Sequence, residues 1–211
     1  MWIDEIGRRL RKILNPNVRR AVGVAANCAL VFTMLGASAA IPGSGSHGRP
    51  MPGTSFVSSP NFSPRPIDAI VDCIVVHATV IDTLQGTVDR FLDLGPAVSA
   101  QYVVDRDGTT VQMVRDEDKA WHAGVSELDG IKGVNDFSIG IEMVNRNDGS
   151  DPYPDAQYEA VARIIKRVRK SNIVPDNRIV SHEFIARPMG RKNDPKGFDF
   201  DKLKRLATEL P

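Results

Sequence analysis

Cysteine is scarce in this sequence, with two residues in a chain of 211. Cys28 lies inside a long apolar run and Cys73 inside a β-branched run, so neither a disulfide framework nor a zinc ribbon of paired cysteines is expected. Cys73 has Ile70, Val71 and Ile74 as neighbours. It is therefore predicted to be a small buried hydrophobic residue rather than a nucleophile.

The chain also lacks an excess of charge of either sign. It has 27 Lys and Arg and 26 Asp and Glu, a net charge of +1 at pH 7, and its 42% apolar and 25% charged residues are typical of a globular protein. Nucleic-acid-binding proteins normally carry a strong basic excess, so no nucleic-acid partner is expected. Six basic and two acidic residues fall within 1–20, where apolar positions recur at helical spacing. This pattern predicts a basic amphipathic N-terminal region.

A long charge-free segment follows this basic region. No Asp, Glu, Lys or Arg occurs from Ala21 until Arg49, and the small residues Ala37-Ser38-Ala39 stand near the end of the apolar part. A basic stretch, an apolar run and a small-residue site together are typical of a signal peptide. Residues 21–41 are also long enough for a single transmembrane anchor. Both interpretations predict export to the periplasm or the outside, with the membrane as a partner of the N-terminal apolar helix.

Residues 42–66 are dense in Gly, Ser and Pro and show no apolar periodicity. Such a segment buries too little surface to offset its ordering entropy, which predicts a linker. The remaining residues, 67–211, are expected to form one folded domain. The sequence shows no internal repeat and predicts no second, wall-binding module.

The domain is predicted to be mixed α/β, with a central, mostly β sheet flanked by helices. Period-2 and β-branched runs predict strands at 70–79, 101–105, 109–114, 138–144 and 178–181, and Asp107-Gly108 predicts a hairpin turn. Apolar residues at helical spacing predict helices at 87–94, 155–170 and 199–210. The basic face of the helix at 155–170 is interpreted as solvated, with contact to wall phosphate as an alternative.

Three of the four histidines end or follow strand-like runs: His77, His122 and His182. Asp194 comes twelve residues after His182. Two imidazoles and one carboxylate form a three-ligand zinc set that leaves a fourth tetrahedral position open, as in catalytic sites. Residue type alone also allows these histidines to be hydrogen-bonded structural residues.

Five segments, in the same order along the chain, resemble the zinc-dependent N-acetylmuramoyl-L-alanine amidases. This type-2 amidase family is related to peptidoglycan recognition proteins and to phage amidase lysozymes. The segments are Val76-His77-Ala78-Thr79, residues 99–108, Ala120-Trp121-His122-Ala123-Gly124, residues 135–142, and Ser181-His182 with residues 185–186 and 190–195.

The resemblance implies that His77, His182 and Asp194 are zinc ligands. It further implies that Glu142 is the general base, which takes a proton from water and passes it to the leaving amine. Lys192 is implied as a cation that stabilises the oxyanion of the tetrahedral intermediate.

Four further residues are expected near the substrate groove: Trp121, His122, Tyr102 and Asn145. Tyr102 is equally compatible with a place in the core. The sequence departs from the family at Ala100 and Gln101, which weakens the case for a catalytic tyrosine, and at Arg187-Pro188-Met189, where the loop to Asp194 is longer.

The function implied is hydrolysis of the amide between N-acetylmuramic acid and L-alanine in peptidoglycan or muropeptide fragments, with Zn²⁺ as cofactor and no obligate protein partner. Two alternatives remain open. One is a non-catalytic peptidoglycan-binding module, and the other is the same activity in a phage endolysin with a releasable anchor.

Overall fold

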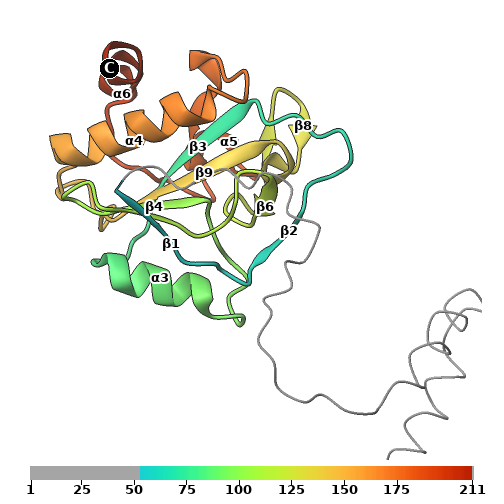
Figure 1. Ribbon diagram of the computed structural model, residues 1–211, viewed down its shortest axis with the longest axis horizontal. Helices are drawn as coiled ribbons and strands as arrows, with labels where there is room; N and C mark the ends of the chain where they lie inside the picture. The colour runs from blue at the N-terminus through green and yellow to red at the C-terminus, as the bar shows by residue number, and fades with distance from the viewer. Residues whose placement is uncertain (1–52, 211) are drawn as a thin grey trace, which may run out of the picture. The chain divides into compact units, whose positions relative to one another are not determined.

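The computed structural model describes residues 53–210, and these contain a six-stranded mixed sheet (Figure 1). The strand order is β1-β5-β4-β9-β3-β10, and every neighbouring pair is parallel except the antiparallel pair β4–β5. The strands are β1 (Thr54–Phe56), β3 (Cys73–Ala78), β4 (Tyr102–Val104), β5 (Thr110–Gln112), β9 (Ser138–Met143) and β10 (Ile179–Ser181).

The centre of the sheet is the pair β3 and β9. They run parallel in register from Cys73 opposite Ser138 to Ala78 opposite Met143. All six residues of β3 are buried, because helices cover both faces of the sheet. This burial accounts for the continuous β-branched run in the sequence, and it confirms the buried interpretation of Cys73, whose thiol pKa is raised by burial to about 12.

Helices α4 (Asp155–Val168) and α6 (Phe200–Glu209) lie on one face of the sheet and α3 (Leu84–Leu92) on the other (Figure 1). Ile164 and Leu203 join the core cluster of Ile74 and Ile139. Phe91 packs in a separate cluster beside β4 and β5. The predicted mixed α/β architecture, with a central sheet between helices, is confirmed.

The predicted hairpin at Asp107-Gly108 is confirmed: β4 pairs with β5, and Gly108 takes the left-handed φ of 85° that such a turn requires. Helix α3 begins three residues earlier than predicted, because the Thr83 side chain caps it by accepting from the Gly86 N–H. Short elements not predicted are β6 (Asp118–Ala120), β7 (Glu127–Leu128), β8 (Ile131–Lys132), α5 (His182–Ile185) and the 3₁₀ turns Val134–Asp136 and Asp176–Arg178.

The predicted linker is wrong over its C-terminal part. β1 pairs with β5, and β2 (Phe62–Pro64) pairs with β6. The polar residues that favoured a linker are buried instead: Ser59 Oγ donates to the Phe91 carbonyl, and Asn61 Nδ2 donates to the carbonyls of Phe91 and Asp93. These bonds satisfy carbonyl groups at the end of α3, so the segment belongs to the folded domain.

The other N-terminal predictions, the basic region 1–20 and the apolar segment 21–41, lie outside the described residues. Within 53–210, none of the helices is both long and apolar enough to cross a membrane.

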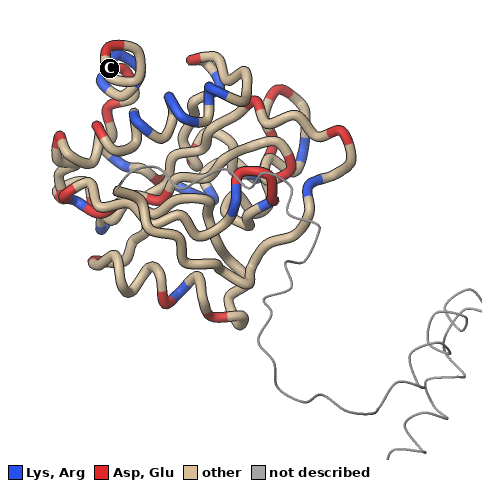
Figure 2. Tube along the Cα trace, viewed as in Figure 1, with Lys and Arg blue, Asp and Glu red and all other residues tan. Residues whose placement is uncertain are grey.

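Charges of both signs share the side of the domain that carries α4 (Figure 2). Arg163 pairs with Glu159, and Arg169 pairs with Asp176. Two basic residues on or just after α4 therefore have acidic partners, which favours the solvated interpretation over a dedicated phosphate-binding strip.

Candidate metal and active site

A cavity of about 220 Å³ opens where β3 and β9 end. His77 on β3 stands directly opposite Glu142 on β9. Since paired residues of parallel strands point to the same face, these two side chains lie next to each other. His182 and Asp194 line the same cavity from the segment after β10. The structure therefore brings together four residues that are far apart in the sequence.

The donor atoms of His77, His182 and Asp194 all lie within 4.8 Å of one another, and all three residues are buried. Asp194 Oδ2 is 3.1 Å from His182 Nδ1 and 3.5 Å from His77 Nδ1. Ligand atoms of a tetrahedral zinc ion bonded at 2.0–2.1 Å lie about 3.3 Å apart. The two donor pairs that include Asp194 Oδ2 thus already lie near the spacing that a zinc ion requires, and two nitrogens with one oxygen are ligands that zinc accepts.

Local structure holds the two later ligands in place. The Ser181 side chain caps α5 by accepting from the Phe184 N–H, which puts His182 at the first helical position. The Glu183 N–H donates to the Asp194 carbonyl at 3.0 Å. This backbone bond ties the loop that carries Asp194 to the helix that carries His182.

His122 lies directly against His77. Its Nδ1 is 3.0 Å from His77 Nε2, and its Nε2 is 3.3 Å from Ser138 Oγ, which in turn donates to the Val134 carbonyl at 2.6 Å. A Cβ at Gly140 would come within 2.5 Å of the His122 ring. His122 also lines the cavity, so it contacts both a predicted zinc ligand and the expected groove.

The ionisable groups of the cavity are strongly perturbed by burial. Burial raises the pKa of Glu142 to about 8, with the Asp194 carboxylate adding to the shift and Lys192 opposing it. Burial, together with His182, lowers the pKa of His77 to about 4. Burial also opposes ionisation of Asp194, but its contacts with the rings of His182 and His77 outweigh burial and lower its pKa. Glu142 Oε2 is buried with no hydrogen-bond partner among the described residues.

Two more predicted residues lie at the cavity. Lys192 is exposed at its rim, close enough for its charge to lower the pKa of Glu142. Trp121 lines the wall, and its indole N–H donates to Ser63 Oγ on β2 at 3.2 Å. Part of the segment predicted as a linker thus positions a side chain of the cavity.

The predicted contact of Tyr102 with the groove is corrected by the structure. Tyr102 is fully buried in the core, and its hydroxyl donates to Asp116 Oδ1 at 2.7 Å. It does not line the cavity. The second interpretation from the sequence, a core residue, is the one observed, because the strand alternation turns Tyr102 toward α4.

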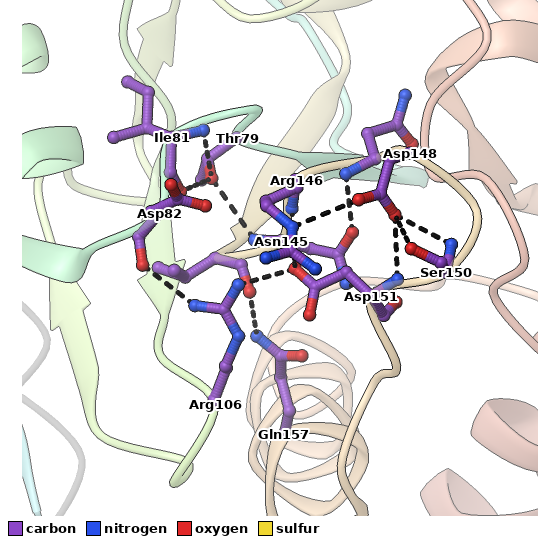
Figure 3. A network of polar contacts seen from close by, with 12 residues as sticks. Thr79, Ile81, Asp82, Arg106, Asn145, Arg146, Asp148, Ser150, Asp151 and Gln157 are labelled. Atoms are coloured by element: carbon purple, nitrogen blue, oxygen red, sulfur yellow. Dashed lines mark hydrogen bonds and ion pairs between the residues drawn. The ribbon is translucent and has the colours of Figure 1, made fainter.

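Asn145 is likewise fully buried and does not line the cavity. Its side chain belongs to the polar network of the loop after β9 (Figure 3). Its Nδ2 donates to the Asp151 carbonyl at 3.0 Å, and its Oδ1 accepts from the Asn147 N–H at 2.7 Å. Its carbonyl accepts from Val80 N–H, which holds Val80 in a left-handed conformation at the cavity wall. Asn145 therefore does not face the cavity but holds Val80, a residue of the cavity wall, in position.

The sequence interpretation missed Asn147 and Arg90. Asn147 Nδ2 donates to Asn193 Oδ1 at 2.9 Å, and its Oδ1 accepts from the Lys196 N–H at 2.6 Å, so it binds the loop of Lys192 and Asp194. Arg90 lines the cavity from α3. The Asn-Asp-Gly turn around Asn147 was a local signal, whereas nothing in the sequence marked Arg90.

A larger cleft of about 680 Å³ lies beside the segment that enters β3, and its lining includes Arg65, Asp116 and Arg167. Arg65 is occupied by hydrogen bonds to four backbone carbonyls. None of the three predicted metal ligands lines this cleft. The smaller cavity is therefore the candidate site, and cleft size is a poor guide here.

The chain is similar to known proteins. The chain matches the family described as N-acetylmuramoyl-L-alanine amidase over residues 66–197. It is 36% identical over 173 residues to the 1,6-anhydro-N-acetylmuramyl-L-alanine amidase AmpD of Enterobacter cloacae, covering 72% of this chain and 89% of that one.

Two solved structures are similar. The first is a crystal structure of AmpD, with 31% identity and a TM-score of 0.61. The match covers 73% of this chain and 94% of the AmpD chain. The second is the Escherichia coli amidase AmiD in complex with anhydro-N-acetylmuramic acid-L-Ala-D-γ-Glu-L-Lys. It has 28% identity and a TM-score of 0.59, and the match covers 67% of this chain and 60% of the AmiD chain.

Proposed function

Because this chain belongs to the N-acetylmuramoyl-L-alanine amidase family, we propose that it hydrolyses the amide between N-acetylmuramic acid and L-alanine in peptidoglycan or its fragments. The observation that carries the proposal is that His77, His182 and Asp194 gather their donor atoms within 4.8 Å, with Glu142 beside His77 on the neighbouring strand. A binding module needs no such set, whereas a zinc-dependent amide hydrolase uses three metal ligands with a base beside them.

His77, His182 and Asp194 would hold zinc through Nδ1, Nδ1 and Oδ2. When bound, zinc supplies Lewis acidity, which polarises a carbonyl and acidifies water. The buried, unpartnered Oε2 of Glu142 is poised to accept a proton from the attacking water. A pKa raised by burial makes the protonated Glu142 a competent donor to the departing amine.

Lys192 and Trp121 complete the proposed site. The Lys192 ammonium would offset the negative charge that develops on the scissile carbonyl oxygen, since it is the cation that already acts electrostatically on Glu142. Trp121, held by Ser63, offers a flat apolar wall for a sugar ring. Both roles involve substrate directly and are separate from metal binding.

The test is digestion of purified peptidoglycan, and of reducing-end and 1,6-anhydro muropeptides, with the full chain, followed by mass spectrometry. We expect free stem peptides that begin with L-alanine, lost with a chelator and restored by zinc. Glu142→Gln is the matched control, because it retains the three metal ligands. Intact muropeptides together with tight sedimentation on peptidoglycan would overturn the proposal in favour of the binding module.

We further propose that the N-terminal segment directs the domain to the wall side of the membrane. The basic residues of 1–20 followed by the charge-free run to Arg49 support this. A fusion of residues 1–52 to a reporter that is active only after export tests it. A reporter recovered only from the cytosol would contradict it.

A further inference from the structure

The cavity carries a second cation that the proposed chemistry does not use. Helix α3 contributes Thr87, Arg90 and Phe91 to the cavity wall. Thr87 and Phe91 are buried, which fixes the helix face, whereas Arg90 is exposed. Among residues 53–210, no side chain or carbonyl hydrogen-bonds or ion-pairs with the Arg90 guanidinium. The group is therefore available to a ligand in the cavity.

A guanidinium presents paired N–H donors that match a carboxylate. Arg90 stands on α3, whereas Lys192, Asp194 and Glu142 come from the loop and strand that hold the reaction centre. Two extended residues span about 7 Å at most. Arg90, Glu142 and Asp194 line the same cavity of about 220 Å³, so a carboxylate one or two residues beyond the scissile amide can lie in the part of the cavity that Arg90 lines.

The substrate class supplies such a carboxylate; this step rests on the proposed function. The stem peptide of the ligand in the AmiD complex is L-Ala-D-γ-Glu-L-Lys. A glutamate linked through its γ-carboxyl group keeps a free α-carboxylate, directly after the L-alanine that leaves. We propose that Arg90 binds this α-carboxylate and makes the enzyme selective for acidic over amidated stem peptides.

The experiment uses two anhydromuramyl tripeptides that differ only in this group, one with D-γ-Glu and one with its α-amide. For the wild-type holoenzyme we expect kcat/KM to fall about 10- to 100-fold on amidation, the range of a charge-assisted hydrogen bond. Arg90→Gln should lose a similar factor on the acidic substrate and little on the amide, so that its selectivity approaches one. Arg163→Gln on α4 is the control and should keep wild-type selectivity.

Binding of the two peptides to the zinc-loaded Glu142→Gln variant, with and without Arg90→Gln, reports on the same subsite without turnover. An acidic preference in binding that Arg90→Gln removes supports the proposal even where no cleavage occurs. Absence of cleavage by the wild type would contradict the proposed function alone. A preference that survives in Arg90→Gln, or no preference in the wild type, would overturn the role of Arg90.

A second, independent observation is the chain of contacts from His77 through His122 to Ser138. His77 Nδ1 faces Asp194 at 3.5 Å and His77 Nε2 faces His122 Nδ1 at 3.0 Å. Ser138 Oγ already donates to the Val134 carbonyl, so it accepts from His122 Nε2. His122 Nδ1 is then an acceptor, and His77 must carry its proton on Nε2.

With its proton on Nε2, His77 keeps a lone pair on Nδ1, and this atom is the one that faces Asp194, another of the predicted metal ligands. We infer that His122 is a positioning residue that sets the tautomer and ring orientation of His77 for zinc. Gly140 contributes, because any larger side chain there would displace the His122 ring. Partners behind a metal-bound histidine commonly change metal affinity by about 10- to 100-fold.

A matched pair of variants tests the inference. Asn at position 122 keeps an acceptor for His77 Nε2–H, whereas Leu removes it at similar size. We expect His122→Leu to weaken zinc affinity, measured by chelator competition, about 10- to 100-fold, and His122→Asn to stay close to the wild type. Imidazole ¹⁵N shifts of the zinc-stripped chain should show the Nε2–H tautomer at His77. Equal zinc affinity in the two variants, or an Nδ1–H tautomer, would overturn the role.

Discussion

Two polar regions of the molecule follow opposite rules. In the turn at 145–151 after β9, donors and acceptors are matched: Asp148 accepts from the N–H groups of Ser150 and Asp151, and Asp151 accepts from Arg106 and Arg146 (Figure 3). In the cavity, Oε2 of the half-buried Glu142 is buried without a partner, and the carboxylate of Asp194 is near enough to raise the pKa of Glu142. Chemistry is expected where buried groups are left unsatisfied, and support where they are satisfied.

The comparison also explains why the two regions are adjacent. An unfavourable arrangement of charges persists only where the surrounding structure holds it in place. The loop after β9 holds Val80 through Asn145 and the segment 193–196 through Asn147. The hydrogen-bonded loop after β9 thus helps to hold the residues of the cavity in place. Variants in the loop and in the cavity should therefore have different consequences.

The largest effect is expected for Asp194→Ala. This change removes one of three ligands and leaves two buried histidines without their carboxylate. Zinc content, measured by elemental analysis after gel filtration, should fall from one per chain toward zero, and amidase activity should disappear. Full zinc content in this variant would remove Asp194 from the ligand set.

Glu142→Gln should separate chemistry from metal binding. A positioned general base contributes about 10²- to 10⁴-fold to rate, so kcat should fall by that range while zinc content stays at the wild-type level. Because Gln removes a buried, unpartnered carboxyl, thermal stability should be equal or higher. Activity within a few-fold of wild type would assign the base elsewhere.

A smaller effect is expected from the supporting loop. Asn147→Ala removes both side-chain bonds to the segment 193–196 and puts an alanine at a φ of 58°. Each hydrogen bond contributes about 0.5–1.5 kcal/mol, so the free energy of unfolding should fall by about 1–3 kcal/mol, measured by urea titration. Zinc affinity should fall as well.

Asn147→Gly is the matched control for that variant, because glycine accepts the left-handed conformation without the side chain. If glycine restores stability but not zinc affinity, the side-chain bonds position the ligand loop. If glycine restores both, the loop is held by backbone conformation alone, and the proposed link between the two regions is wrong.

Tyr102→Phe should have the smallest functional effect. It removes the bond to Asp116, whose pKa is already raised by burial. The free energy of unfolding should fall by about 1–3 kcal/mol, while kcat/KM for a muropeptide should not change. A loss of kcat/KM without a loss of stability would indicate that Tyr102 contacts the substrate after all.

Prediction from the sequence was most successful where the signal was local. The β-branched runs of β3 and β9, the Asp107-Gly108 turn and the apolar face of α4 each depend on neighbouring residues. The candidate ligands His77 and His182 stand at strand ends, and a strand end can be recognised without knowing its partners. The short strands β1 and β2 were missed because their pairing partners lie 54 to 58 residues away in the sequence.

By itself, the sequence determined the mixed α/β class and the family, and through that resemblance it led to the proposal of three candidate ligands with a candidate base and cation. Residue type and order are enough for that, because each motif carries its chemistry locally. Only the tertiary structure decided that Tyr102 and Asn145 serve the core and the supporting loop, that His122 contacts His77, and that Arg90 reaches the cavity. These roles depend on which buried partner satisfies each polar atom, and such partners come from segments distant in the chain.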